Sequence, residues 1–201
     1  MFETLKSLDQ QLFLFLNGKH NAFFDFIMFW ASDRFIWIPF YAFLFFLVIK
    51  SFGKKTWLIL LLIGLMITMS DQVSSGLVKN AVHRLRPCHT PGVEEKVHLV
   101  NGVCGGSFGY FSSHASNTWA LALFLIYIFR RKLSKSNPSE KKVIGIYTLT
   151  TILITYASVV SYSRIYLGTH YPFDVFTGVV FGTLLSFIFA QLFFRFAEKS
   201  I

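Results

Sequence analysis

The sequence predicts an all-α membrane protein, a polytopic bundle of five or six transmembrane helices with an N-terminal amphipathic helix. Composition is the first indication: the 201 residues are 54% hydrophobic and only 14% charged, whereas about a quarter of the residues in a soluble domain are charged. The second indication is a series of apolar runs of about 18 residues, long enough to cross a hydrocarbon core. We expect one integral-membrane domain over residues 1–201.

The first 34 residues are expected to form interfacial helices. Residues 1–17 place five leucines among polar residues, the amphipathic pattern of a helix that lies in the membrane surface. Residues 21–30 are apolar but too short to span a bilayer alone, and Asp25, Asp33 and Arg34 interrupt this stretch. The sequence leaves open whether this second stretch spans the membrane or lies on it.

Longer apolar runs make up the predicted transmembrane core of residues 35–195. These runs are residues 35–49, 57–78, 115–129, 143–162 and 173–194. We expect the helix of the second run to continue to Arg84 and to end at Pro87, because proline cannot continue a helix. The polar segment 85–112 then joins the second run to the third.

Cationic residues predict the orientation of the bundle. The turn 50–55, the loop 130–142 and the C-terminus hold eleven of the nineteen Lys and Arg residues, and five spans place these three segments on one side. Positively charged loops stay in the cytoplasm, so the segment 85–112 faces outward, into the periplasm if the protein lies in a bacterial inner membrane. The net charge of +9 therefore reflects topology, and we expect no nucleic-acid partner.

Residues 163–174, between the fourth and fifth runs, carry the most informative polar side chains. Arg164, His170 and Asp174 would be costly at membrane depth unless they had a function. Pro172 is placed to start the fifth helix, which puts Asp174 in its first turn, within reach of His170. A carboxylate that fixes one imidazole nitrogen leaves the other free as nucleophile or base, and the planar cation of Arg164 suits phosphate. This stretch predicts a phosphoryl-transfer site.

Two further polar groups lie at the outward ends of the second and third runs. Lys79 and Arg86 are seven residues apart, so on one helix they would share a face; alone, they could equally be cations that extend to the membrane surface. Ser112 or Ser113 can cap the third helix, whose free N–H groups bind anions, and His114 would project from its first turn. Alone, this pattern is equally a helix cap beside an interfacial histidine. Because all these groups lie at one membrane level, we interpret them together as one phosphate site.

These groups resemble a known set of motifs. In order and spacing they resemble the three signature motifs of the type 2 phosphatidic acid phosphatase and vanadium haloperoxidase superfamily. The matching segments are Lys79-x6-Arg86-Pro87, Ser112-Ser113-His114 and Ser163-Arg164-x5-His170-x3-Asp174. The resemblance covers the chain from Asp71 to Gly182. The middle motif departs from the family's Pro-Ser-Gly-His, because Phe111 and Ser113 replace the proline and the glycine.

The resemblance implies a role for each residue of the motifs. His170 would be the nucleophile that forms a phosphohistidine, and Asp174 would orient its ring. His114 would protonate the leaving oxygen and then activate water. The phosphoryl oxygens would be held by the remaining residues, Lys79, Arg86, Ser112, Ser113 and Arg164. The family needs no metal or other cofactor, and we expect none here.

The implied activity is that of a metal-independent lipid phosphate or diphosphate phosphatase at the outer membrane face, with a lipid phosphate as its partner and no obligate protein partner. Undecaprenyl diphosphate is the first expectation for the substrate; a lipid A phosphate, phosphatidylglycerol phosphate and phosphatidate are the alternatives. A transporter or an anion-binding subunit is the non-enzymatic alternative, although the chain has no evident inverted repeat of the transporter kind. The sequence chooses neither the lipid head group nor the oligomeric state.

Cys88 and Cys104 lie in the outer segment, which is expected to face an oxidising compartment. A disulfide between them is therefore one interpretation. Two free thiols are the other, because the distance between the two residues does not follow from the sequence.

Overall fold

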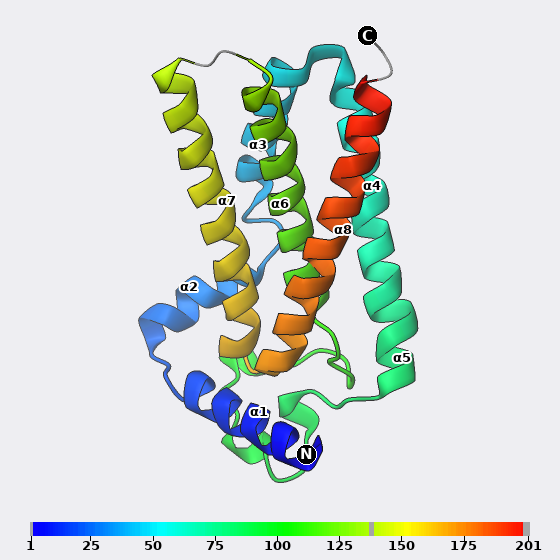
Figure 1. Cartoon of the computed structure of the whole chain (residues 1–201). Helices are drawn as coiled ribbons and strands as arrows, with labels where there is room; N and C mark the ends of the chain where they lie inside the picture. Colours follow the sequence, from blue (N-terminus) through cyan, green and yellow to red (C-terminus); the bar gives the residue numbers. More distant parts are fainter. Residues whose placement is uncertain (1, 137–138, 199–201) are drawn as a thin grey trace.

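The computed structural model describes residues 2–136 and 139–198, and within them the chain forms helices, turns and one isolated antiparallel bridge between Leu85 and Phe108, with no β-strand. The α-helices are α1 (Phe2–Asn17), α2 (Ala22–Ser32), α3 (Ile38–Phe52), α4 (Thr56–Asp71), α5 (Lys79–Val82), α6 (Ser113–Ser134), α7 (Glu140–Tyr166) and α8 (Pro172–Glu198). The shorter helical turns are η1 (Gly53–Lys55), the π-helical η2 (Gln72–Val78), η3 (Pro87–His89), η4 (Glu94–Lys96) and η5 (Val100–Gly102). In Figure 1 the long helices run side by side as a bundle, and α1 lies across its lower end. The all-α prediction is confirmed.

Three helical stretches among the described residues are long and apolar enough to cross a membrane: Ile38–Val82, Glu140–Tyr166 and Pro172–Ala197. The first reverses direction at Gly53, whose positive φ of 52° suits glycine, so α3 and α4 form a hairpin (Figure 1). The 22 residues of α6 also run through the bundle, but the polar residues of its first turns lower its hydropathy. The fold is thus a membrane-helix bundle, and the number of spans stays a prediction.

The packing of α8 against α6 brings two of the sequence motifs together. Gly178 and Gly182 of α8 face the first turns of α6 at very short range. A Cβ atom at Gly178 would lie 2.5 Å from the carbonyl oxygen of Ser112, and one at Gly182 would lie 2.3 Å from that of Ser116. Pairs of small residues four apart let helix backbones approach this closely. The start of α8 is therefore held against the start of α6.

The inner part of the bundle is apolar. One cluster of buried side chains from α3, α4, α6, α7 and α8 fills it, and Ile59, Phe124 and Leu153 are fully buried members. Figure 1 places the α3–α4 turn, the α6–α7 connection and the C-terminal end of α8 together, at the end of the bundle away from α1. These segments are the cation-rich ones, except that Lys199 lies outside the described residues. The cations thus gather at one end of the bundle and the motifs at the other.

The second apolar run ends earlier than its sequence predicts. Its last α-helical residue is Val82, because His83 adopts a left-handed conformation with φ 51° and donates its N–H to Lys79 O at 3.1 Å. The backbone beyond it pairs with the far end of the outer segment: Gly109 donates to Arg84 O at 2.9 Å, and Arg86 donates to Ser107 O at 3.0 Å. The predicted helix to Arg84 is therefore wrong. Lys79 and Arg86 do not share a helix face, and Pro87 does not end that helix.

The amphipathic α1 buries an unexpected face. Its buried residues are Asp9, Phe13 and Asn17, which are four residues apart and lie on one side of the helix. Leu5, Leu8 and Leu12 are exposed instead, as suits a helix whose apolar side meets lipid. The buried polar residues fasten α1 to the bundle: Asn17 Nδ2 donates to Tyr166 O at 2.7 Å, and the N–H of His98 donates to Asn17 Oδ1 at 2.7 Å.

Candidate active site

His170 lies in the tight turn between α7 and α8, and only 1% of its surface is exposed. Its N–H and that of Thr169 both donate to Arg164 O at 3.1 Å, which closes the end of α7. Gly168 makes the turn possible, because it has a φ of +73° and a Cβ there would lie 2.5 Å from Val97 Cγ1. The backbone that carries His170 is therefore fixed by the end of α7 and by the Gly168 turn.

Asp174 lies in the first turn of α8 beside His170, and α8 begins at Pro172 as the sequence predicts. The carboxylate of Asp174 is fully buried. Its Oδ2 accepts the N–H of Tyr171 at 2.9 Å and lies 3.7 Å from His170 Nδ1. That distance is longer than a hydrogen bond, so the two residues are adjacent without the bond that would orient the ring.

Two arginines flank the histidine with part of their hydrogen-bonding capacity unused. Arg86 Nη1 donates to Thr169 O at 3.1 Å, and Arg164 Nη1 donates to the hydroxyl of Ser32 on α2. The Nε atoms of both arginines and Nδ1 of His170 are buried without a hydrogen-bond partner in the described part of the chain. A phosphate oxygen is a strong acceptor for unpaired guanidinium nitrogens, so these cations are arranged to receive an anion.

The electrostatics around His170 favour its neutral form. Burial, followed by the positive charges of Arg86, Arg164 and Lys79, lowers the pKa of the imidazole well below its usual value. Lys79 is half-buried, directly after the π-helical turn η2, and donates to Ser75 Oγ at 3.3 Å. A neutral imidazole carries the lone pair that a nucleophile requires, and the cations that keep it neutral also suit the phosphate.

The serine–histidine motif begins α6 at the same end of the bundle. Ser112 is the N-cap, with its hydroxyl accepting from Ala115 N at 3.5 Å, and its own N–H donates to Asp174 O at 3.0 Å. Ser113 is the first helical residue, and the side chain of His114 is exposed in the first turn. The cap, the helix N–H groups and His114 thus lie next to the start of α8, where the third motif sits.

A family model described as the PAP2 superfamily matches residues 57–198, which include all three motifs. The chain belongs to this superfamily. It is an integral-membrane lipid phosphatase, a phosphoric monoester hydrolase by the activity of its relatives.

Two relatives of this PAP2 phosphatase match nearly the whole chain. A lipid A 4'-phosphatase of Bacteroides thetaiotaomicron is 36% identical over 191 residues, which cover 94% of this chain and 78% of that protein. A lipid A 4'-phosphatase of Porphyromonas gingivalis is 33% identical over 184 residues, covering 91% of this chain and 72% of that protein. Among solved structures, the transmembrane PAP2-type phosphatidylglycerolphosphate phosphatase from Bacillus subtilis matches with a TM-score of 0.67 at 21% identity, covering 98% of this chain and 87% of that one.

Two residues beside the PAP2 motifs, Arg84 and Asp9, were not predicted from the sequence. Arg84 donates from Nη1 to Asp174 Oδ1 at 2.7 Å and from Nη2 to Asp9 Oδ2 at 2.5 Å. Arg84 was expected only as the last residue of a helix, so its pairing with Asp174 and Asp9 was not predicted. The spacing of Asp9, Phe13 and Asn17 on α1 was the available signal for Asp9, since residues four apart lie on one side of a helix.

Other polar residues of the outer end support the architecture. Asp71 accepts from Asn117 Nδ2 at 2.9 Å, which joins the end of α4 to α6. Cys88 and Cys104 are joined by a disulfide within the outer segment. Two groups of described side chains are close enough to share a metal ion, Cys88–His89–Cys104 and His20–Asp25–His98. Neither contains a residue of the three motifs, and the disulfide removes the thiolates of the first.

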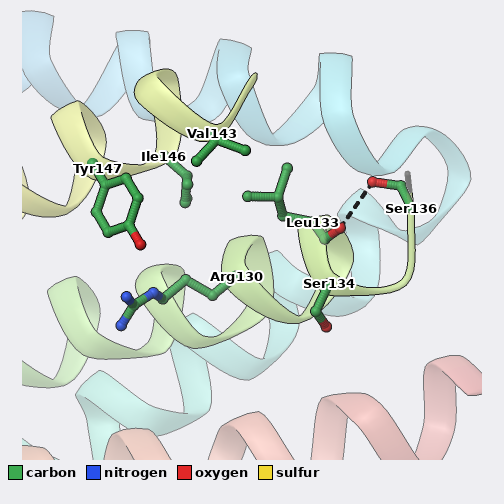
Figure 2. A pocket seen from close by; sticks show the side chains of 7 residues that line it. All are labelled: Arg130, Leu133, Ser134, Ser136, Val143, Ile146 and Tyr147. Atoms are coloured by element: carbon green, nitrogen blue, oxygen red, sulfur yellow. Dashed lines mark hydrogen bonds between the residues drawn. The ribbon is translucent and has the colours of Figure 1, made fainter. Parts of the chain in front are cut away.

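Two cavities of the described residues lie away from the motifs. One of about 220 Å³ opens between α6 and α7 near their connection (Figure 2), lined by Arg130, Leu133, Ser134, Ser136, Val143, Ile146 and Tyr147. Another of about 310 Å³ opens between α6 and α8, and Arg130 lines both. No residue of the three motifs lines either cavity, so the candidate site is identified by its chemistry and not by its volume.

Proposed function

We propose that this PAP2 phosphatase removes the 4'-phosphate of lipid A through a phosphohistidine on His170, without a metal ion. The observation that carries the chemistry is the burial of the His170 imidazole between two guanidinium groups whose Nε atoms have no partner; this burial and these cations lower the pKa of the ring. The substrate rests on the two relatives that are lipid A 4'-phosphatases over most of this chain. Lipid A therefore replaces undecaprenyl diphosphate as the first candidate.

The reaction proceeds in two balanced steps. Asp174 lies on the Nδ1 side of the His170 ring, so Nε2 attacks the phosphorus while the bond from phosphorus to the sugar oxygen breaks, and His114 gives that oxygen its proton. Water then attacks the phosphohistidine, His114 takes a proton from the water, and the P–N bond breaks. The products are the lipid alcohol and inorganic phosphate, and both histidines return to their initial state.

The cations of the site stabilise charge that develops during both steps. Arg86 and Arg164 offer unpaired guanidinium nitrogens, and Lys79 adds a positive charge beside them. The N-terminus of α6, with Ser112 as its cap and Ser113 as its first residue, adds backbone N–H groups. Such preorganised donors stabilise a phosphoryl transition state more than its ground state.

We place the site at the periplasmic face of the inner membrane. The cation-rich segments lie at the end of the bundle away from α1 (Figure 1), and the positive-inside rule puts that end in the cytoplasm. Single cysteines test this orientation, because the two native cysteines are joined in a disulfide. An impermeant thiol reagent on spheroplasts should label Glu95→Cys and spare Ser136→Cys, two positions with exposed side chains. The reverse labelling would place the site in the cytoplasm.

Phosphate release from a substrate panel tests the activity. Detergent-solubilised protein is given lipid A, undecaprenyl diphosphate or phosphatidylglycerol phosphate, with and without EDTA, and the lipid product is identified by mass spectrometry. We expect lipid A to lose its 4'-phosphate at a rate that EDTA does not change, and vanadate to inhibit by occupying the phosphate site. Faster hydrolysis of undecaprenyl diphosphate than of lipid A would overturn the proposal that lipid A is the substrate. Loss of activity in EDTA that Mg²⁺ restores would overturn the mechanism.

A further inference from the structure

Asp9 is a buried carboxylate on a helix that carries none of the sequence motifs. It is 3% exposed, on the side of α1 that faces the bundle. Both of its oxygens accept hydrogen bonds from elements far away in the sequence: Oδ2 from Arg84 Nη2 at 2.5 Å, and Oδ1 from the N–H of Phe173 at 3.0 Å. Phe173 directly precedes Asp174 in the first turn of α8. Asp9 is therefore connected to the site through a side chain and through the backbone.

Arg84 lies between two carboxylates. Its Nη2 pairs with Asp9, its Nη1 pairs with Asp174 Oδ1 at 2.7 Å, and its guanidinium stacks over the Tyr171 ring, 4.5 Å from the centroid. Burial alone would lower the pKa of Arg84, but the charges of Asp174 and Asp9 raise it above its usual value. The planar fork of a guanidinium can hold two carboxylates in fixed positions, which an ammonium cannot do.

The pairing separates Arg84 from the other cations of the site. Arg86 and Arg164 each have a buried Nε without a partner, as a phosphate ligand would. Both terminal nitrogens of Arg84 are instead occupied by carboxylates. Arg84 is thus arranged to hold Asp174, and not to bind the substrate.

We propose that Asp9 and Arg84 are positioning residues for the catalytic pair, and that α1 is in this way a required part of the active site. The inference rests on the proposed function of His170 and Asp174. Arg84 fixes Oδ1 of Asp174, which leaves Oδ2 facing His170 Nδ1 at 3.7 Å. Asp9 holds Arg84 in place and anchors the first turn of α8 through Phe173.

A double-mutant cycle tests whether Asp9 acts on Asp174 through Arg84, a connection called the relay from here on. Asp9→Asn keeps the shape of the side chain and removes its charge, and we expect kcat to fall about 10-fold to 100-fold, the usual effect of removing an outer partner of a catalytic group, with KM unchanged. Arg84→Gln should lower kcat further, and the double variant should match Arg84→Gln alone, because Asp9 acts through Arg84. Glu3→Gln, at an exposed position of the same helix, is the matched control and should change nothing.

The cycle also identifies the outcome that would overturn the relay. Independent, additive losses would mean that Asp9 does not act through Arg84, and equal changes in kcat and KM would mean that Asp9 does not act on the catalytic step alone. Wild-type kcat in Asp9→Asn would exclude the relay altogether. If Asp9→Asn does not fold, Arg84→Lys takes its place: it keeps one positive charge between the carboxylates, and should fold with a lower kcat and an unchanged KM. Unchanged kcat in Arg84→Lys would also overturn the relay.

Amide hydrogen exchange separates a failure of the relay from a failure of the proposed function. If the wild-type protein releases phosphate from none of the tested lipids, the proposed function is wrong. Amide hydrogen exchange then tests separately whether Asp9 anchors the first turn of α8. Asp9→Asn should speed exchange at Phe173 and along α1 relative to Glu3→Gln, because the hydrogen bond that Phe173 N donates loses its charged acceptor and the ion pair between α1 and Arg84 is lost. Equal exchange in the two variants would show that Asp9 does not anchor α8. In an active protein the kinetic cycle decides.

Discussion

The two ends of the bundle are stabilised by different forces. At the inner end, helices contact one another through apolar side chains such as Phe124 and Leu153. At the outer end, a smaller apolar cluster that includes Phe13 and Tyr171 is joined by buried polar side chains, and ion pairs and hydrogen bonds to the backbone hold Asp9 and Asp174. A substitution at the inner end should therefore change stability more than catalysis, and one at the outer end should change catalysis more than stability.

The difference has a physical cause. Apolar packing is roughly proportional to buried area and tolerates changes of similar volume. A buried charge that loses its partner is uncompensated, and its whole surroundings must adjust. The outer end thus holds its catalytic groups in place through specific pairs, while the inner end provides a scaffold that many apolar sequences could form.

The largest effect is expected at the outer end, from the nucleophile. His170→Ala should lower kcat by at least about 10⁴-fold, because removal of a covalent nucleophile leaves only binding and electrostatic catalysis. Its melting temperature in detergent should stay close to that of the wild type. Phosphate release is the measurement, and His89→Ala in the outer segment, where the ring pairs with Gly105 O at 3.2 Å, is the control. Appreciable turnover by His170→Ala would contradict the mechanism.

A cavity at the inner end should have the opposite signature. Leu153 on α7 is fully buried in the apolar cluster, and Leu153→Ala should destabilise the protein by about 2–5 kcal/mol. The kcat of the folded fraction should be unchanged. Thermal unfolding and phosphate release, measured on the same sample, check the two halves of this expectation. A large loss of kcat at full folding would mean that the inner packing also sets the geometry of the site.

Gly182 tests the contact that joins the two regions. A Cβ there would lie 2.3 Å from Ser116 O, so Gly182→Ala should force α8 away from α6 and cost about 1–3 kcal/mol. It should also lower kcat, because the start of α8 carries Asp174. Gly145→Ala on α7, where a Cβ would meet nothing within 4 Å, is the matched control. That change should be neutral or slightly stabilising, since alanine favours a helix over glycine. Equal melting temperatures for the two variants would contradict the close packing.

The sequence predicts the inner end better than the outer end. Hydropathy and the position of Pro172 are local signals, and they place the helices and the start of α8. The left-handed His83 leaves no comparable signal, so the end of the second run and the relation of Lys79 to Arg86 were predicted wrongly. The pairing of Asp9 with Arg84 joins residues 75 positions apart, and it depends on how α1 docks. Long-range ion pairs of this kind follow from the fold and not from local pattern.

The smallest expected effect is a pH dependence of stability that originates at the outer end. Burial, with the neighbouring cations, lowers the pKa of His170 in the folded protein well below 6.5, while the unfolded chain titrates near that value. Above pH 6.5 both states are neutral at this residue, and the stability is fully present. As the pH falls below 6.5, the unfolded state takes up a proton that the folded state does not, so the free energy of unfolding decreases by at most about 1.4 kcal/mol per pH unit. Melting temperatures between pH 7.5 and 5.5 should show this decrease in the wild type and a shallower one in His170→Gln. Equal slopes in wild type and His170→Gln would mean that folding does not lower the pKa of this imidazole, so the site would not hold the ring in the neutral form that attacks phosphorus.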